Sequence, residues 1–247
     1  KNVCKIVSTT AFTIGKLAMV VGQAGQEKKE VVLVANAPPL DYSFKELRSC
    51  LELETEEPRG HKPRAGEKDA GEAAESVASP TSKAKENEPK MRILLRKVTT
   101  SVKLNNNMLE SASGLPQALE FRLSNPLLNL QWLDLSFNQL VTVEPDLLRF
   151  YNLKALYMHG NCITRLSAVD RLRKLPKLIS LTMNGNPIES AKIYRVYVMG
   201  ALPTLRSLDH SSITDEEANN AAAWFQGHLV RAKKKKEEMA LQALDAM

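Results

Sequence analysis

Leu130 to Leu140 reads LQWLDLSFNQL, with leucine at the first, fourth, sixth and eleventh positions and Asn138 at the ninth. This spacing, LxxLxLxxNxL, is the signature of a leucine-rich repeat. Leu133 and Leu135 are two residues apart on a short strand, so their side chains point to the same side, into a core. At the turn that follows, the Asn138 amide can bond backbone groups that would otherwise be buried unpaired.

The same spacing recurs downstream at a nearly constant period. Asn161 follows Asn138 by 161 − 138 = 23 residues, and Asn186 follows Asn161 by 186 − 161 = 25. Repeats of this class are roughly 20 to 29 residues long. The apolar positions of these two copies are Leu153, Leu156, Met158 and Ile163, and then Leu178, Leu181, Met183 and Ile188. The recurrence predicts a solenoid with these side chains in its core.

Weaker copies flank the three strong ones. Upstream, Val102, Leu104, Asn107 and Leu109 keep the spacing, with Thr99 in the first leucine slot. Asn138 follows Asn107 by 138 − 107 = 31 residues, which predicts extra turns on the convex side of that coil. Downstream, Leu205, Leu208 and Ile213 have lost the asparagine, as expected of a terminal coil. We therefore predict an α/β leucine-rich repeat solenoid of about four to five coils over residues 91–213, with parallel strands on its concave face.

The composition excludes several classes of protein. The 247 residues carry a net charge of +6, which permits acidic partners without selecting among them. Three scattered cysteines, Cys4, Cys50 and Cys162, are too few for a disulfide framework and favour a reducing compartment. No apolar run reaches the roughly 18 to 20 residues that span a bilayer. We predict a protein of a reducing compartment without a membrane span.

The N-terminal region divides into two segments. Residues 1–37 are expected to be a poorly ordered extension, in which Glu30–Val34 can form a short strand. The alternative, an organellar transit peptide, is less favoured because the usual arginine bias is missing. Residues 38–58 begin with PPLDYSF, in which Leu40, Tyr42 and Phe44 alternate and are expected to project together from one side. This segment either caps the exposed edge of the solenoid, which we favour, or docks onto a partner.

Two further segments complete the domain organisation. Residues 59–90 consist mainly of Glu, Lys, Ala, Gly, Ser and Pro and predict a disordered, charged linker. Residues 214–247 begin with a capping box, in which Thr214 and Glu217 satisfy each other's backbone amides, and predict a C-terminal capping helix with a basic tail. The tail contains Arg231 and Lys233–Lys236. A solvated helix face is the favoured role of these charges, and contact with phosphates or an acidic tail is the alternative.

The sequence contains no known catalytic motif. A Walker loop, a dinucleotide-binding glycine pattern, a nucleophile elbow and paired zinc-ligand spacing are all missing. His159 and Cys162 are close, but zinc requires four ligands and no others accompany them. We therefore predict no catalytic residue, no metal, no cofactor and no small-molecule substrate.

The residues free to contact a partner are those on the open face of the strands. Trp132 and Tyr157 stand out, because exposed aromatic side chains ringed by polar groups are typical of binding hot spots. The alternative is that the N-terminal segment or the C-terminal tail of the same chain covers them. The candidate partner-binding residues are Lys103, Trp132, Asp134, Lys154, Tyr157, His159, Arg206 and Asp209.

Seven stretches resemble, in order, those of the leucine-rich repeat-containing protein 51 family. They are PPLDYSF (38–44), EEPR (56–59), LNNNML (104–109), DLSFNQL (134–140), YMHGNCI (157–163), LPKLISLTMNGNP (175–187) and YRVYV (194–198). The cap LPTLRSLDHSSIT (202–214) is similar to those of axonemal dynein light chain 1 and the spliceosomal A-prime protein, which bind protein partners. The resemblance implies a non-catalytic cytoplasmic repeat protein with a link to cilia.

Together the residues and the resemblance predict a protein-interaction scaffold that uses its concave face. The expected partners are proteins, among them cytoskeletal or axonemal ones. The alternative is a nucleic-acid-associated adaptor that uses the basic tail, with Lys103 and Lys154 adding phosphate contacts. We favour the scaffold because the strands present no continuous basic stripe.

Overall fold

The structure is a computed structural model that describes residues 19–20, 30–60, 75–76 and 92–245. The chain divides into two units. Unit 1 comprises Lys1–Ala37 and Lys68–Val98, and unit 2 comprises Pro38–Glu67 and Thr99–Met247.

A parallel sheet forms the inner layer of unit 2. Over its described residues the strand order is β11-β10-β9-β8-β7-β6-β3, and every neighbouring pair is parallel except β10 with β11. Val102, Leu133, Leu156 and Leu181 align in register on successive strands and are fully buried. The strands are β3 (Leu40–Asp41), β6 (Ser101–Lys103), β7 (Trp132–Asp134), β8 (Ala155–Tyr157), β9 (Ser180–Thr182), β10 (Ser207–Leu208) and β11 (Ser211–Ser212). The leucine-rich repeat solenoid expected from the sequence is confirmed.

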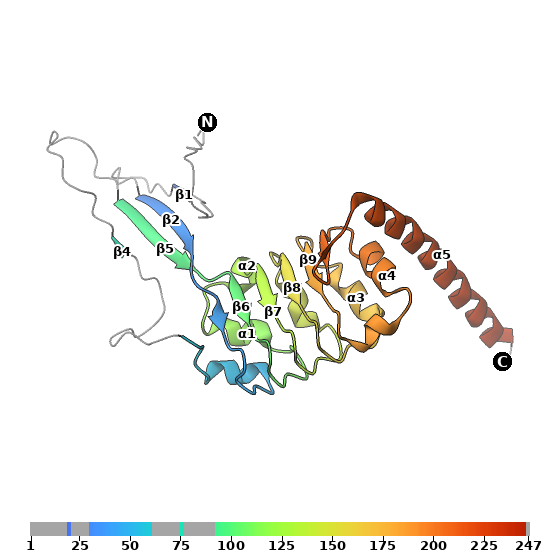
Figure 1. Ribbon diagram of the computed structural model, residues 1–247, viewed down its shortest axis with the longest axis horizontal. Coiled ribbons are helices and arrows are strands. Elements are labelled where there is room, and N and C mark those ends of the chain that lie inside the picture. The colour runs from blue at the N-terminus through green and yellow to red at the C-terminus, as the bar shows by residue number, and fades with distance from the viewer. Residues whose placement is uncertain (1–18, 21–29, 61–74, 77–91, 246–247) are drawn as a thin grey trace. The chain divides into compact units, whose positions relative to one another are not determined.

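Short helices return the chain from one strand to the next, and Figure 1 shows the strands β6 to β9 succeeding one another along the solenoid. The 31-residue interval from Asn107 to Asn138 holds two short helices, in agreement with the extra turns that its length predicts. The returns are η1 (Cys50–Glu54), α1 (Leu115–Glu120), α2 (Pro126–Asn129), η2 (Pro145–Arg149), α3 (Ser167–Leu172), η3 (Pro187–Ser190) and α4 (Tyr194–Ala201). Leu119, Leu147 and Leu172 from three of them are fully buried and close the core from the convex side.

Buried asparagines join each coil to the one before it. Asn138 Nδ2 donates to Leu104 O of the preceding coil at 2.9 Å and to Leu135 O of its own coil at 3.0 Å. Its Oδ1 accepts from the amide of Leu109 at 3.1 Å. Asn107, Asn161 and Asn186 make equivalent bonds one coil apart. This asparagine ladder confirms the role that the sequence predicts for Asn138.

The PPLDYSF segment supplies the first coil. Leu40 pairs with Val102 in register, and Tyr42 is fully buried, whereas Phe44 is 59% exposed and has a left-handed backbone. The expectation that Leu40, Tyr42 and Phe44 share one side is therefore wrong, because the left-handed residue breaks the alternation of an extended chain. Lys45 occupies the asparagine position of this coil, and its amide bonds Asn107 Oδ1 at 2.9 Å. This coil lies ahead of those that carry β6, β7, β8, β9 and β10. The solenoid therefore has six coils over its described residues, where four to five were expected.

Helix α5 (Asp215–Asp245) follows the last coil. The predicted capping box is present, with Glu217 N donating to Thr214 Oγ1 at 3.1 Å and Thr214 N to Glu217 Oε2 at 3.0 Å. Ala221 and Phe225 are buried against α4. Leu229, one turn further along the helix, is 40% exposed. Beyond it α5 projects past the last coil (Figure 1).

Unit 1 contains a second sheet, with the order β1-β2-β5-β4 over its described residues. Strands β2 (Glu30–Asn36) and β5 (Arg92–Val98) are parallel, and β1 (Met19–Val20) and β4 (Glu75–Ser76) lie antiparallel at the edges. The sequence placed Arg92–Val98 at the start of the repeat domain and Glu75–Ser76 in a disordered linker. Both pair in this sheet instead, because RILLRKV is a β-prone match for EVVLVAN. The rest of the expected linker, residues 61–74 and 77–90, lies outside the described residues, as do most of residues 1–29.

Candidate functional site

The open face of the solenoid sheet is built from two rows of side chains that the strand register aligns. One row, at the carboxyl ends of the strands, is Asp41, Lys103, Asp134, Tyr157 and Thr182. The other row contains Trp132 flanked by the small residues Ser101, Ala155, Ser180 and Ser207. Because its neighbours in the row are small, the Trp132 indole is the dominant side chain at that end of the strands.

Five aromatic rings from three coils meet on this face. The Trp132 and Tyr157 ring centroids are 5.4 Å apart and nearly perpendicular, an arrangement typical of attractive aromatic pairs. Tyr157 lies 6.3 Å from His159 and 6.0 Å from His210, and these two histidines are 5.7 Å apart. Phe137 is 5.0 Å from His159 and 53% exposed. We call Trp132, Phe137, Tyr157, His159 and His210 the aromatic cluster.

Phe137 and His210 reach the cluster through unusual backbone conformations. Both have positive φ angles, 52° and 63°. The Phe137 ring lies so close to Gly160 that a Cβ there would be 2.7 Å from Cδ1. The sequence analysis missed both residues, because neither occupies a regular strand position. A comparison of DYSFKEL (41–47) with DLSFNQL (134–140) shows the shared D-x-S-F-x-x-L pattern and could have identified the Phe137 turn.

His159 is held as a neutral ring. Its Nδ1 lies 2.9 Å from Thr182 Oγ1. Burial lowers the pKa of His159 below its ordinary value; the Asp134 and Asp209 carboxylates oppose this and His210 reinforces it. The imidazole is therefore uncharged at neutral pH and can accept or donate one hydrogen bond at Nδ1.

This pKa shift predicts a pH dependence of stability. Because the pKa of His159 is lower in the folded state, the unfolded chain binds the proton first as pH falls below about 6.5. Stability is therefore expected to decrease through that range and to level off below the folded-state pKa. Thermal unfolding at pH 7.5 and 5.5 should show a smaller decrease in midpoint for His159→Gln than for wild type. Equal decreases of the unfolding midpoint in the two proteins would show that protonation of His159 does not contribute to the pH dependence of stability.

Two of the predicted partner-binding carboxylates are used inside the fold. Asp209 Oδ1 accepts from the amides of Met183 and Asn184 at 2.7 and 3.0 Å, and Oδ2 accepts from Tyr194 OH at 2.8 Å. Both oxygens of Asp209 are thus bonded within the fold, one to the preceding coil and the other to α4. Asp134 Oδ1 accepts from Ser136 N and Ser136 Oγ at 2.9 and 2.6 Å, which leaves its Oδ2 on the open face.

The predicted basic residues do not join the aromatic cluster. Lys103 Nζ is 4.0 Å from Asp41 on the neighbouring strand. Lys154 and Arg206 immediately precede β8 and β10, at the opposite end of the strands from His159. Arg206 faces Asp215 at 3.5 Å. The structure thus brings together Trp132, Asp134, Tyr157 and His159 of the predicted set.

The described residues offer no group of three or more His, Cys, Asp or Glu side chains that could hold a metal. Cys50 is buried and Cys162 exposed, both as free thiols. No described helix combines the length and the apolar character needed to span a membrane.

A comparison with models of protein families agrees with this architecture. A family model described as a leucine-rich repeat matches residues 120–240. The U2 small nuclear ribonucleoprotein A' of Emericella nidulans is 32% identical over 97 residues, which is 39% of this chain and 42% of that protein. The crystal structure of the Drosophila melanogaster SNF/U2A' complex matches with a TM-score of 0.45 and 25% identity, over 55% of this chain and 75% of that chain.

A longer match identifies the family. Leucine-rich repeat-containing protein 51 of Mus musculus is 40% identical over 188 residues, which cover 76% of this chain and 84% of that protein. The matched length exceeds the repeats alone, so more than a shared periodicity relates the two sequences. The chain belongs to the leucine-rich repeat-containing protein 51 family.

Proposed function

We propose that this protein is a non-catalytic interaction scaffold whose concave face binds a helix or loop of a protein partner. Trp132 and Tyr157 are the anchors of this contact. The observation that carries the proposal is the aromatic cluster, in which the half-buried rings of Trp132, Tyr157 and His159 and the exposed ring of His210 lie together on the open face of the sheet. Large aromatic side chains grouped in this way are typical of the energetic centre of an interface.

The chain's own described segments do not cover the cluster. The sequence suggested that the N-terminal segment or the C-terminal tail could cover these rings. The PPLDYSF segment instead contains β3, at the edge of the sheet. The C-terminal helix packs on α4 through Phe225 and Ala221. Neither of these two segments therefore blocks the rings from a partner. This supports the interpretation of the concave face as a binding surface.

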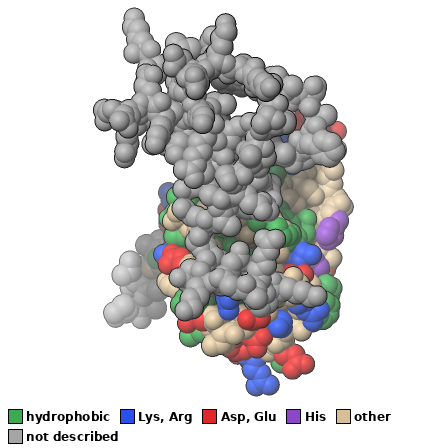
Figure 2. Space-filling model, turned by 90° about the vertical axis from the view of Figure 1, so that its left-hand side faces the viewer, with side chains coloured by type: hydrophobic (Ala, Val, Ile, Leu, Met, Phe, Trp, Pro, Cys, Tyr) green, Lys and Arg blue, Asp and Glu red, His purple; other side chains and the backbone are tan. Residues whose placement is uncertain are grey.

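The charges around the cluster favour a protein partner over a nucleic acid. Lys103 is paired with Asp41, Arg206 is paired with Asp215, and Asp134 adds a carboxylate beside the rings. Figure 2 does not look onto the concave face, but at the end of the molecule that it draws Lys and Arg are also interspersed with Asp and Glu where grey atoms do not cover them. A phosphate backbone requires a continuous positive surface, whereas mixed charge suits the rim of a protein interface.

The first test of this proposal measures binding of a selected peptide. Peptides selected by display against the full chain are expected to bind wild type and to lose about 30-fold or more in affinity for Trp132→Ala/Tyr157→Ala, since truncating a hot-spot residue costs about 2 kcal/mol or more. The chain has two tryptophans, and Trp224 in α5 lies outside the cluster. The indole N–H resonance of Trp132 should therefore shift on binding while that of Trp224 does not.

Tyr151→Ala is the matched control for the aromatic substitutions. Tyr151 is 56% exposed and lies between η2 and β8, away from the cluster. Its replacement should leave peptide affinity within about twofold. Circular dichroism and the unfolding midpoint must be unchanged in the double variant. If selected peptides bind that folded variant as tightly as wild type, the concave face is not the binding site.

We further propose that the protein acts in the cytoplasm and that its partner is an axonemal or other cytoskeletal protein. The similarity of the cap at residues 202–214 to that of axonemal dynein light chain 1 supports this part of the proposal. Immunofluorescence of the endogenous protein in ciliated cells is expected to show staining along the axoneme. Staining confined to the nucleus would contradict it.

A second candidate function is that of a ribonucleoprotein adaptor. Arg231 and Lys233–Lys236 are all exposed on α5, and one relative is by name a ribonucleoprotein component. Two of these charges are partly offset, because Lys233 and Lys234 lie 3.8 Å from Glu237 and Glu238. If this function holds, RNA binding should fall steeply between 50 and 200 mM salt and depend on the tail. Binding through the aromatic cluster should change little over the same range.

A further inference from the structure

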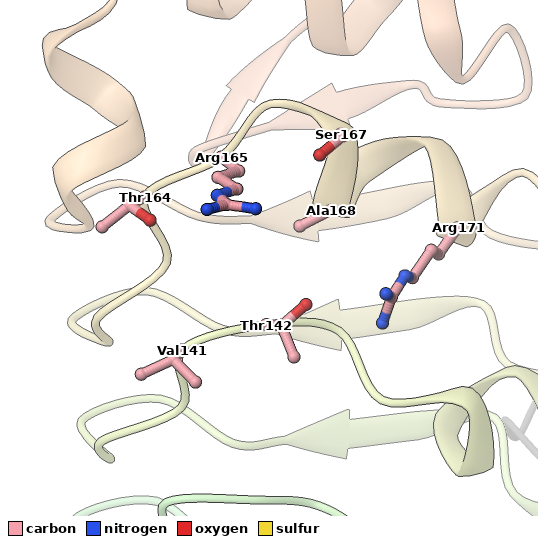
Figure 3. A pocket seen from close by; sticks show the side chains of 7 residues that line it. All are labelled: Val141, Thr142, Thr164, Arg165, Ser167, Ala168 and Arg171. Atoms are coloured by element: carbon pink, nitrogen blue, oxygen red, sulfur yellow. The ribbon is translucent and has the colours of Figure 1, made fainter.

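A polar pocket of about 310 Å³ lies between two successive coils, away from the aromatic cluster. It opens where the chain leaves the asparagine turns, since Thr142 follows Leu140 and Arg165 follows Ile163 by the same two residues. Val141 and Thr142 come from one coil, and Thr164, Arg165, Ser167, Ala168 and Arg171 come from the next (Figure 3). None of these residues belongs to the concave face.

Two arginines make this pocket positive. Figure 3 shows the guanidinium groups of Arg165 and Arg171 with Ala168 between them in this view and Thr142 on the neighbouring coil. No carboxylate lines the pocket, and neither arginine has a carboxylate within 4.0 Å among the described residues. The nearby Arg149, by contrast, faces Asp146 at 3.8 Å. The two positive charges of the pocket are therefore left without an internal counter-ion in the part of the chain described.

The pocket also presents unused hydrogen-bond donors. Arg171 Nη1 donates to Val143 O at 2.7 Å, which fixes the side chain and leaves its other N–H groups available. The hydroxyls of Thr142, Thr164 and Ser167 make no hydrogen bond within the described structure. Two guanidinium groups and three hydroxyls exceed what one carboxylate can accept, but they match the three terminal oxygens of a phosphate.

We propose that this pocket binds a phosphate monoester, with Arg165 and Arg171 pairing its charge and the hydroxyls completing its hydrogen bonds. Two guanidinium groups balance the charge of a phosphate dianion, and paired arginine donors suit its oxygens better than lysine would. The site is independent of the concave face. A scaffold of this kind could therefore respond to a phosphorylated residue or to a small phosphorylated molecule.

The test titrates the ¹⁵N-labelled full chain with inorganic phosphate at constant ionic strength. Saturable shifts are expected for the amides of Thr142, Arg165 and Ser167, with a dissociation constant on the order of 1 mM. Arg165→Gln should weaken binding about tenfold or more, because a charge-assisted hydrogen bond is lost. The Arg165 side chain makes no hydrogen bond or ion pair within the described residues, whereas Arg171 also donates to Val143 O, so Arg165 is the variant of choice.

Lys174→Gln is the matched control, because Lys174 is exposed, follows α3 and does not line the pocket. It removes one positive charge nearby and should change the affinity by less than about twofold. Acetate at the same concentration should bind more weakly than phosphate. N-acetyl-phosphoserine amide tests the monoester itself, and saturation at or below the concentration needed with inorganic phosphate identifies a phosphorylated residue as the ligand. Failure of this monoester to bind while inorganic phosphate binds would overturn the proposal. Non-saturable shifts with both phosphates, equal binding of acetate, or an unchanged affinity in Arg165→Gln would overturn the proposal.

Discussion

Replacing Asn138 by alanine is expected to lower the free energy of unfolding by about 2 to 4 kcal/mol, a large effect for a single substitution. The side chain is buried and bonds four backbone groups on two coils. The carbonyls of Leu104 and Leu135 keep a second partner, Asn107 and Asn161 respectively. The amide of Leu109 loses its acceptor, so one buried donor becomes unsatisfied. Three carbonyl oxygens each lose one of their hydrogen-bond donors.

Urea unfolding followed by far-ultraviolet circular dichroism measures this effect. Asn105→Ala provides the control, because Asn105 lies in the same type of coil but its side chain makes no hydrogen bond in the described structure. Its replacement should change the free energy of unfolding by no more than about 0.5 kcal/mol. Equal effects of the two substitutions would mean that the ladder contributes little to stability.

The repeat core could be predicted from the sequence because each of its positions obeys a strict local rule. A leucine two residues from another on a short strand must share its face, and an asparagine three residues later must satisfy the turn. Leu133, Leu135 and Asn138 follow these rules and occupy the expected places. Thr214 and Glu217 are similar, since a capping box depends on residues only three apart.

The first coil escaped prediction because its defining residue is substituted. Lys45 stands where the asparagine is expected, and Lys45 joins the ladder only through its backbone amide, which donates to Asn107 Oδ1. The backbone geometry survives this change, as the bond from Leu47 N to Asn107 Oδ1 shows. The asparagine of the repeat signature is missing, so a search for LxLxxNxL does not find this first coil. The pairing of β2 with β5 was missed for another reason, since the two strands are distant in sequence and no local rule links them.

The candidate site was predictable where strand positions determine it. Trp132 and Tyr157 were identified because the period of two places them on the open face, and the structure puts their rings 5.4 Å apart. Asp209 follows the same period, but tertiary contacts with Met183 and Tyr194 occupy its carboxylate. Phe137 and His210 enter through positive φ angles, which the period of a strand cannot predict.

The C-terminal helix depends on a close approach at Gly200 in α4. A Cβ at this position would be 2.5 Å from Phe225 Cβ and 2.6 Å from Ala221 O, both in α5. The approach lets the Phe225 ring pack edge-on against Tyr197, with 5.3 Å between centroids. One of the two contacts is a backbone oxygen, so no truncation of a side chain can make room for an added methyl group.

Gly200→Ala is therefore expected to destabilise the protein by about 2 to 4 kcal/mol, although alanine favours a helix by about 1 kcal/mol over glycine. The helices must separate, and burial of Phe225 is lost with them. Hydrogen exchange over residues 215–230 and the indole resonance of Trp224 should report the release of α5, while Trp132 stays unchanged. Gly227→Ala in α5 is the control, because its Cβ would meet only the flexible end of Arg231 at 3.2 Å, and stabilisation of about 0.5 to 1 kcal/mol is expected. If Gly200→Ala instead stabilises the chain as Gly227→Ala does, α5 does not pack on α4 at this glycine.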